Sequence, residues 1–202
     1  MNKDRFLNGI GDRFFINRGS VIDNSNDIVT QAISILKLTP ESILEIGCAD
    51  GWRLKLLKKR YPDCKCSGVD PSSIAVVNSD SSISVVVGTA DALPYEANDY
   101  DVVIYGFCLY CCDRSDLFKI ASEGDRVLKT GGHLIILDFY PDTPQYNVCP
   151  DDYDMFTYKM NYGNLFSWHP AYEQVFKHVY VEEDNMAKDN VAVIVFKKKG
   201  CR

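Results

Sequence analysis

The chain has 202 residues, of which 46% are apolar and 25% are charged, and its formal net charge is −6. These values are typical of a globular protein with one substantial core, so we expect a single domain over residues 1–202. Basic residues gather only in short runs at 55–60 and 197–199, which argues against nucleic acid as a partner. No apolar run is long enough to span a membrane, and residues 1–15 are too charged for a secretory signal. We therefore expect a cytoplasmic protein without membrane attachment.

The predicted elements alternate between helices and short apolar strands. In chain order they are a helix at 25–38 with cap candidates at 24–26, a strand at 43–46, a helix at 52–60, a strand at 66–69, a helix at 72–78, strands at 83–87 and 102–105, a helix at 113–128 that stops before Gly131-Gly132, a strand at 133–139, and strands at 174–180 and 191–196 joined by the polar turn 182–190.

This alternation predicts an α/β fold in which helices cover both faces of a mostly parallel seven-stranded sheet. The last two strands have only a short turn between them, so they are expected to form an antiparallel C-terminal hairpin. Right-handed connections would bring the strand ends that carry Glu45, Asp70, Asp91 and Gly106 to one edge of the sheet. Ligands of such sheets bind at that edge.

The eight cysteines raise the question of a metal or redox site. Cys64 and Cys66 form a C-x-C pair, and Cys108, Cys111 and Cys112 form C-x-x-C-C. Zinc knuckles usually combine two C-x-x-C pairs on short turns, a pattern that this chain lacks. A redox pair of Cys108 with Cys111 is the weaker alternative. We expect no metal and reduced cysteines that serve as small apolar side chains.

The sequence ILEIGCADGWRL, residues 43–54, carries the most specific signal of the chain. An apolar strand ends in an acid, a glycine-spaced turn follows, and a helix begins directly after it. This geometry presents backbone N–H groups and a positive helix end to a ligand. A P-loop would need Gly-Lys-Ser/Thr, and a dinucleotide fingerprint would need a third glycine where Trp52 stands.

The loop resembles motif I of the class I S-adenosylmethionine (SAM) dependent methyltransferases, E/D-x-G-x-G-x-G, in the stretch Glu45-Ile46-Gly47-Cys48-Ala49-Asp50-Gly51. Ala49 departs from the pattern and is expected to lose the freedom of glycine to adopt a positive φ. The resemblance spans residues 39–139, about half of the chain, and implies a Rossmann-like three-layer sandwich that binds SAM.

The resemblance also implies a set of cofactor contacts. Asp70, followed by Pro71, matches the acid that binds both ribose hydroxyls, and a carboxylate can accept two hydrogen bonds at once. The stretch 88–94 is similar to the family's G-D-A-x-x-L-P, from which Asp91 and Ala90 are assigned to the adenine. The positions left for the methionine part are Glu45, Gly47, Cys48, Ala49, Gly51, Gly106 and Phe107.

A methyltransferase also binds the molecule that accepts the methyl group. We assign the binding of this acceptor to the aromatic segment 140–172, which we interpret as a substrate lid. Residues 1–38 are interpreted as an N-terminal cap. Aromatic side chains with polar tips suit a small-molecule site. Candidate substrate contacts are Tyr140, Tyr158, Lys159 and Tyr162, and candidate catalytic residues are Tyr110, Asp138 and His169. Each also has a structural interpretation, in packing, capping or covering the sheet.

The leading functional hypothesis is methyl transfer from SAM to an oxygen or nitrogen of a small-molecule acceptor, such as a sugar or another metabolite. The alternative is a non-catalytic SAM-binding regulatory or partner subunit, because no residue is an evident base. A nicotinamide oxidoreductase is disfavoured by Trp52 and Asp91. A homodimer is compatible with the sequence.

Overall fold

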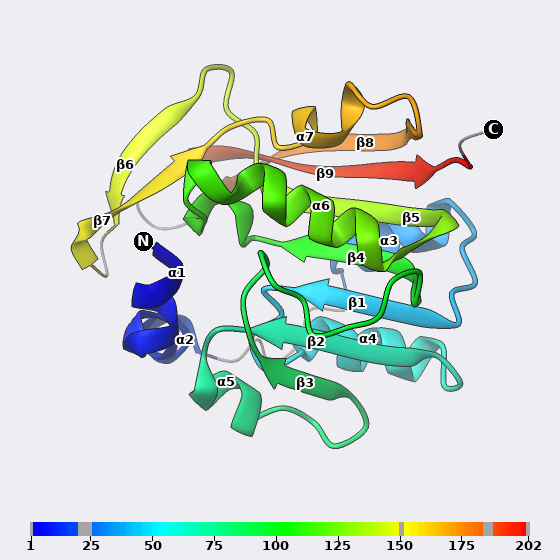
Figure 1. The fold of residues 1–202 in the computed structure, drawn as a ribbon, viewed down its shortest axis with the longest axis horizontal. Helices are drawn as coiled ribbons and strands as arrows, with labels where there is room; N and C mark the ends of the chain where they lie inside the picture. Colours follow the sequence, from blue (N-terminus) through cyan, green and yellow to red (C-terminus); the bar gives the residue numbers. More distant parts are fainter. Residues whose placement is uncertain (1, 20–25, 150–151, 184–187, 201–202) are drawn as a thin grey trace.

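A seven-stranded sheet forms the centre of the computed structural model, which describes residues 2–19, 26–149, 152–183 and 188–200 (Figure 1). The strand order is β3-β2-β1-β4-β5-β9-β8. The strands β3, β2, β1, β4 and β5 pair with one another in parallel, and β9 is antiparallel to both of its neighbours, β5 and β8. The predicted α/β sheet with an antiparallel C-terminal hairpin is therefore confirmed. The strands are β1 Ser42–Ile46, β2 Lys65–Asp70, β3 Ser84–Val87, β4 Tyr100–Gly106, β5 Leu128–Phe139, β8 Tyr172–Glu183 and β9 Lys188–Lys198.

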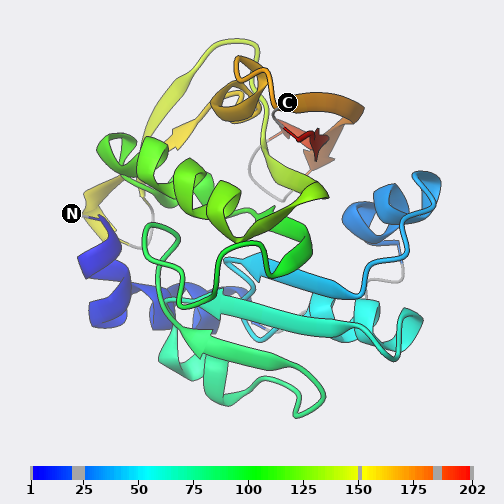
Figure 2. The same ribbon diagram turned by 45° about the vertical axis from the view of Figure 1, so that its right-hand side comes forward.

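Helices cover both faces of the sheet and complete the three layers (Figure 2). On one face, α3 (Ile28–Ile35) and α4 (Trp52–Arg60) enclose an apolar core with β1, β4, β5 and β9. On the other face, α6 (Leu117–Val127) and α7 (Asn164–Ser167) pack over a second core. The short helix α5 (Ser73–Val77) contacts β2 and β3. Within the described ranges, no helix is both long and apolar enough to cross a membrane.

The N-terminal segment lies at the carboxyl ends of the parallel strands (Figure 1). It consists of α1 (Asn2–Arg5), a π-helical turn η1 (Phe6–Ile10) and α2 (Gly11–Arg18), with a kink at Asn8 and Gly9. Asp12 fixes α2 to α5, because its carboxylate accepts hydrogen bonds from Ser72 Oγ at 2.7 Å and from the N–H of Ile74 at 3.0 Å. The sequence did not predict these helices, since they contain few regularly spaced apolar residues.

The boundary between α6 and β5 differs from the prediction. A helix was expected to reach residue 128 and stop before Gly131-Gly132, but α6 ends at Val127 and β5 begins at Leu128. The glycine pair lies inside the strand, where the pairing with β4 shifts register. At its start, α6 is preceded by the 3-10 turn η3 (Arg114–Asp116), so it is shorter than expected at both ends.

The aromatic segment after β5 contains an unpredicted second sheet. Strands β6 (Gln145–Cys149) and β7 (Asp152–Lys159) pair antiparallel, and β7 packs against the 3-10 turn η2 (Leu109–Cys111). Tyr146 stacks on Phe156 across the pair, with ring centroids 4.5 Å apart. Exposed aromatics of this kind do not alternate clearly with polar residues, so the sequence pattern did not reveal the strands.

We expect Gly124→Ala to destabilise the fold by about 1–3 kcal/mol, the usual cost of overpacking a core. A Cβ at this position of α6 would lie 2.1 Å from Oη of the fully buried Tyr105, whose hydroxyl donates to the carbonyl of Ile120 at 2.8 Å. Denaturant unfolding measures the change. Ser122→Ala, on the exposed side of the same helix, is the control and should change the unfolding free energy by less than about 0.5 kcal/mol. Equal stability of both variants would contradict the packing argument.

Candidate cofactor and acceptor site

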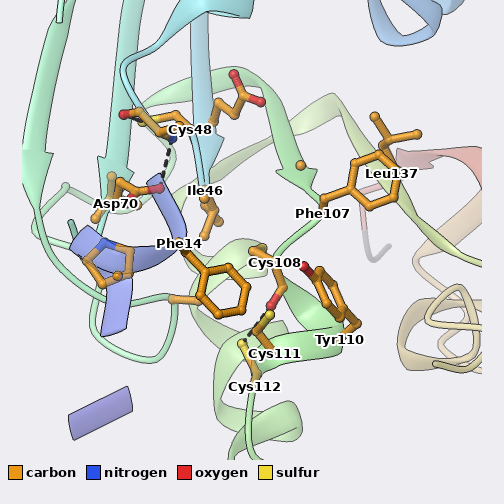
Figure 3. Close-up of a pocket in the computed structure, with 18 of the residues that line it drawn as sticks. Phe14, Ile46, Cys48, Asp70, Phe107, Cys108, Tyr110, Cys111, Cys112 and Leu137 are labelled. Atoms are coloured by element: carbon orange, nitrogen blue, oxygen red, sulfur yellow. Dashed lines mark hydrogen bonds between the residues drawn. The ribbon is translucent and has the colours of Figure 1, made fainter. Parts of the chain in front are cut away.

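A cavity of about 840 Å³ lies at the carboxyl ends of β1, β2 and β4. Its volume is within the range of small-molecule sites. Figure 3 shows part of its wall, where Asp70 and Cys48 lie near the glycine loop, and Phe107 and Tyr110 lie on the opposite side. The N-terminal segment contributes Phe14 to the wall, so several elements line the cavity.

The glycine loop between β1 and α4 follows a tight path that small residues permit. Gly47 has φ of 76°, and a Cβ there would lie 2.5 Å from Cβ of Cys108. Ala49 also has a positive φ, of 50°. The expectation that alanine would lose this conformation is therefore wrong. The loop keeps its shape at a backbone cost of about 1–2 kcal/mol.

A buried ion network forms one wall of the cavity. Arg53 of α4 donates through Nε to Asp27 at 2.9 Å and through Nη1 to Glu45 at the end of β1. All three side chains are at most 6% exposed. Asp27 is also the N-cap of α3, since it accepts from the N–H of Thr30 at 2.8 Å. The predicted caps were residues 24–26; 24 and 25 lie outside the described residues, and the cap is one residue further on.

One oxygen of this network has no partner in the described structure. Oε2 of Glu45 is buried without a hydrogen bond, and Glu45 lines the cavity. Burial raises the pKa of Glu45 to about 7, although the adjacent Arg53 opposes the shift. An unsatisfied carboxylate oxygen next to a cavity is a binding position for a cationic group such as an ammonium.

Asp70 stands at the end of β2, beside Glu45 of β1 along the sheet edge. Its Oδ2 accepts from the N–H of Ala49 at 2.8 Å (Figure 3), and its Oδ1 accepts from the N–H of Ser72 at 2.9 Å. Burial raises the pKa of this carboxyl, and the two backbone hydrogen bonds counteract the shift. Each oxygen retains a lone pair for a further donor, and both Asp70 and Pro71 line the cavity.

The assignment of Asp91 to the adenine stays a prediction: Asp91 lines the cavity, and its carboxylate is bound to donors of the protein. Aligned letter by letter with G-D-A-x-x-L-P, the acid position falls on Thr89, two residues earlier. Asp91 accepts from Lys3 Nζ at 2.6 Å, from Lys119 Nζ at 3.2 Å and from Thr89 Oγ1 at 2.8 Å. Burial opposes its charge, but these donors lower the pKa of Asp91 to about 2. Asp91 therefore joins α1 to the cavity wall, and both Asp91 and Ala90 line the cavity.

The end of β4 lines the cavity through Gly106 and Phe107. A Cβ at Gly106 would lie 2.6 Å from Oε1 of Glu45, so glycine is required for this close approach. Phe107 follows with φ of 51°, an uncommon value for a phenylalanine, and its N–H donates to the carbonyl of Leu137 at 2.8 Å. The hydrogen bond and the contact with Phe139 hold this strained residue in place.

Of the predicted catalytic residues, Tyr110 lines the cavity and Asp138 does not. Arg18 donates to Oη of Tyr110 at 2.9 Å, and burial raises the pKa of Tyr110, which suits a hydrogen-bond donor better than a base. Asp138 is buried and accepts from the N–H groups of Leu109 at 3.0 Å and Phe139 at 2.8 Å. Burial raises its pKa to about 7. Its contacts assign it to holding η2 against β5.

His169 lies at the wrong end of the sheet for catalysis. Its carbonyl accepts from the N–H of Tyr172, which begins β8 opposite Lys198. The neighbouring Lys197 pairs with His133 near the start of β5. The carboxyl end of β5, where the cavity lies, is at the other edge, so the prediction of a catalytic His169 is corrected.

The four predicted substrate contacts also lie outside the cavity wall. Tyr140 accepts from Lys177 at 2.5 Å, and Lys159 pairs with Asp189 at 2.5 Å. Tyr162 is buried and donates to the carbonyl of Tyr158 at 2.5 Å. These side chains are committed to each other and to neighbouring strands, so they support the cavity wall from behind.

The cavity instead contains residues that the sequence interpretation missed. His178 and Tyr180 of β8 line it, as do Lys3, Cys111 and Cys112. The sequence pattern indicated a strand at 174–180, but the pairing of β8 next to β9 is needed to bring it near the cofactor edge. Burial raises the pKa of both cysteines, so they are neutral thiols. Among the described residues, no cluster of histidine, cysteine or acidic side chains could hold a metal ion.

Comparisons with known proteins agree with this site. Residues 44–136 match the family model described as a methyltransferase domain. The demethylmenaquinone methyltransferase of Thermotoga maritima is 31% identical over 112 residues, which cover 53% of this chain and 47% of that protein. A malonyl-[acyl-carrier protein] O-methyltransferase of Coxiella burnetii is 29% identical over 131 residues, which cover 65% of this chain and 45% of that protein. The chain thus spans less than half the length of these curated relatives.

Solved structures share the fold. A SAM-dependent methyltransferase of Methanosarcina mazei superposes with a TM-score of 0.67 at 19% identity, covering 83% of this chain and 97% of that one. The 1,6-didemethyltoxoflavin-N1-methyltransferase of Burkholderia thailandensis, with S-adenosylhomocysteine bound, gives 0.71 at 12% identity and covers 98% and 87%. Together with the motif-I loop and the acid of β2, the domain match over residues 44–136 supports a class I SAM-dependent methyltransferase.

Proposed function

We propose that this protein transfers a methyl group from SAM to an oxygen or nitrogen of a small-molecule acceptor. The unpartnered oxygen of Glu45 carries the proposal, because it offers a buried anionic contact at the position where the methionine ammonium of SAM needs one. The neighbouring Asp70 keeps acceptor capacity for two ribose hydroxyls. The carboxylates that line the cavity therefore fit the cofactor.

The remaining contacts follow from the same wall. The loop of Gly47 to Gly51 adjoins the methionine part of the cofactor, and Ala90 adjoins the adenine. When bound, SAM supplies an activated methyl group, so the protein has to bind it, orient the acceptor and exclude water. Phe107 lines the same cavity and adds an aromatic ring to its wall.

An enclosed cavity with aromatic walls supports a small acceptor rather than a nucleic acid. Phe15, Phe107, Tyr110 and Tyr180 provide these walls. The relatives are named for methylation of a quinone precursor, a carrier-bound malonyl group and a toxoflavin precursor, so their acceptors vary widely. We propose a soluble, cytoplasmic enzyme whose acceptor is a small molecule. A homodimer is compatible with the fold.

Transfer of labelled methyl groups tests the function directly. We expect the protein, incubated with methyl-labelled SAM and a panel of phenols, enols, amines and sugars, to label at least one acceptor. Labelling needs a bound acceptor in line with the methyl group, which a purely regulatory SAM-binding subunit would not provide. SAM binding with no labelled product across the panel would favour the regulatory alternative.

Asp70→Asn should weaken S-adenosylhomocysteine binding by roughly 10- to 100-fold, because a charged hydrogen-bond acceptor is worth about 1.5–3 kcal/mol. Calorimetry measures the affinity, and circular dichroism checks that the fold is intact. Asp80→Asn is the matched control: Asp80 pairs with Lys55 away from the cavity, so its loss should leave the affinity unchanged. Equal affinities in both variants would remove the ribose assignment.

The affinity for S-adenosylhomocysteine should rise with pH up to about 7 and then level off. In the free protein the raised pKa keeps Glu45 protonated below about 7, whereas the bound ammonium requires the carboxylate. Binding therefore releases a proton in this range. Calorimetry across pH should show a flat, weaker profile for Glu45→Gln, while the exposed Glu41→Gln keeps the wild-type profile. A wild-type profile in Glu45→Gln would disprove the role of Glu45.

A further inference from the structure

His178 is the feature of the cavity that the cofactor contacts leave unused. It lies on β8, directly opposite Val193 of β9, which in turn pairs with Leu137 of β5. Residues directly opposite in antiparallel strands have side chains on the same face of the sheet. Leu137, Val193 and His178 therefore form one row across three strands, with His178 roughly 10 Å from Leu137.

A second row lies next to the first, nearer the cofactor edge. It consists of Phe139, Val191 and Tyr180, paired in the same way. Phe139 contacts the ring of Phe107 at 5.6 Å, and the rings of Tyr180 and His178 stack at 6.0 Å. The two rows thus connect the end of β4, beside the cofactor positions, to the imidazole of His178.

Most other proton acceptors of the cavity already have donors. Glu45 and Asp27 share Arg53, as described above. Asp91 binds Lys3, and Asp113 accepts from the backbone N–H of Asn2 at 2.6 Å.

Two further carboxylates are close to donors of their own chain. Asp116 lies 3.9 Å from Lys3, and Asp50 accepts from the N–H of Trp52 at 3.3 Å. The cysteines and Tyr110 are neutral because burial raises their pKa.

His178 differs from all of these groups. It is exposed to the cavity rim, and no described residue forms a hydrogen bond with either ring nitrogen. Imidazole is the side chain whose ordinary pKa suits proton transfer near neutral pH. Its neighbour Tyr180 offers a flat surface on which an aromatic ring can stack.

Building on the proposed function, we propose that the acceptor is a flat ring with an acidic O–H or N–H group, bound against Phe107 and Tyr180, and that His178 takes its proton. The O–H or N–H bond of the acceptor breaks, and the proton moves to a ring nitrogen of His178, which becomes an imidazolium. The electron pair stays on the acceptor atom, which is then the nucleophile for the methyl group.

Binding of 4-nitrophenol to the S-adenosylhomocysteine complex tests this assignment, because its phenolate is coloured and its phenol is not. At a pH below the pKa of free 4-nitrophenol, the wild-type complex should bind the probe and raise its ionised fraction. His178→Gln should lower the ionisation constant of the bound probe by about tenfold, the value of one charge-assisted hydrogen bond. His169→Gln is the matched control and should behave as wild type.

The outcomes separate the two proposals. If S-adenosylhomocysteine does not bind, the proposed function itself fails. If it binds but 4-nitrophenol does not, the ring site on β8 is wrong. If the probe binds with the same ionised fraction in wild type and His178→Gln, His178 is not the base. Calorimetry of S-adenosylhomocysteine with His178→Gln should give the wild-type affinity, which excludes damage to the cofactor region.

Discussion

The cavity depends on one buried cation, Arg53. It joins α4 to the end of β1 through Glu45 and to the N-terminus of α3 through Asp27. Two carboxylates could not be buried this close together without it, since an unpaired buried charge costs several kcal/mol. The pair interactions leave Oε2 of Glu45 unsatisfied, so the same network that organises three elements also provides the anionic contact that we propose for the cofactor.

The opposite wall depends on the N-terminal segment, which is attached by polar contacts more than by a deep core. Lys3 binds Asp91, Asp12 caps the start of α5, and Arg18 donates to Tyr110. Each contact joins the segment to a residue at or next to the cavity. The cofactor site is therefore assembled from chain regions that lie far apart in sequence, although the parallel strands alone define its floor.

The sequence predicted the parallel sheet, the C-terminal hairpin and the glycine loop, because apolar strands and a helix start leave strong local patterns. It also placed Asp70 at the cavity, since strand order fixes which ends meet. It placed Asp91 at the cavity as well, but it did not predict the partners Lys3 and Lys119, because they come from distant helices. His169 and the four candidate substrate contacts of the aromatic segment lie outside the cavity wall for a similar reason. Which edge of the sheet a loop reaches depends on the pairing of β9 with β5 and on its register, and no local pattern encodes that pairing.

The sheet changes from parallel to antiparallel pairing between β5 and β9. This change separates the proposed cofactor residues from the proposed acceptor residues. The match to the methyltransferase domain covers 44–136 and ends within β5, before β8 and β9 begin. The proposed cofactor positions lie in the parallel half, whereas His178 and Tyr180 belong to β8, which pairs with β9. At the acceptor site that we propose, substitutions on β8 alter acceptor recognition and leave the glycine loop unchanged. Such a division gives the protein a simple route to diverge in substrate while one half of its sheet stays the same.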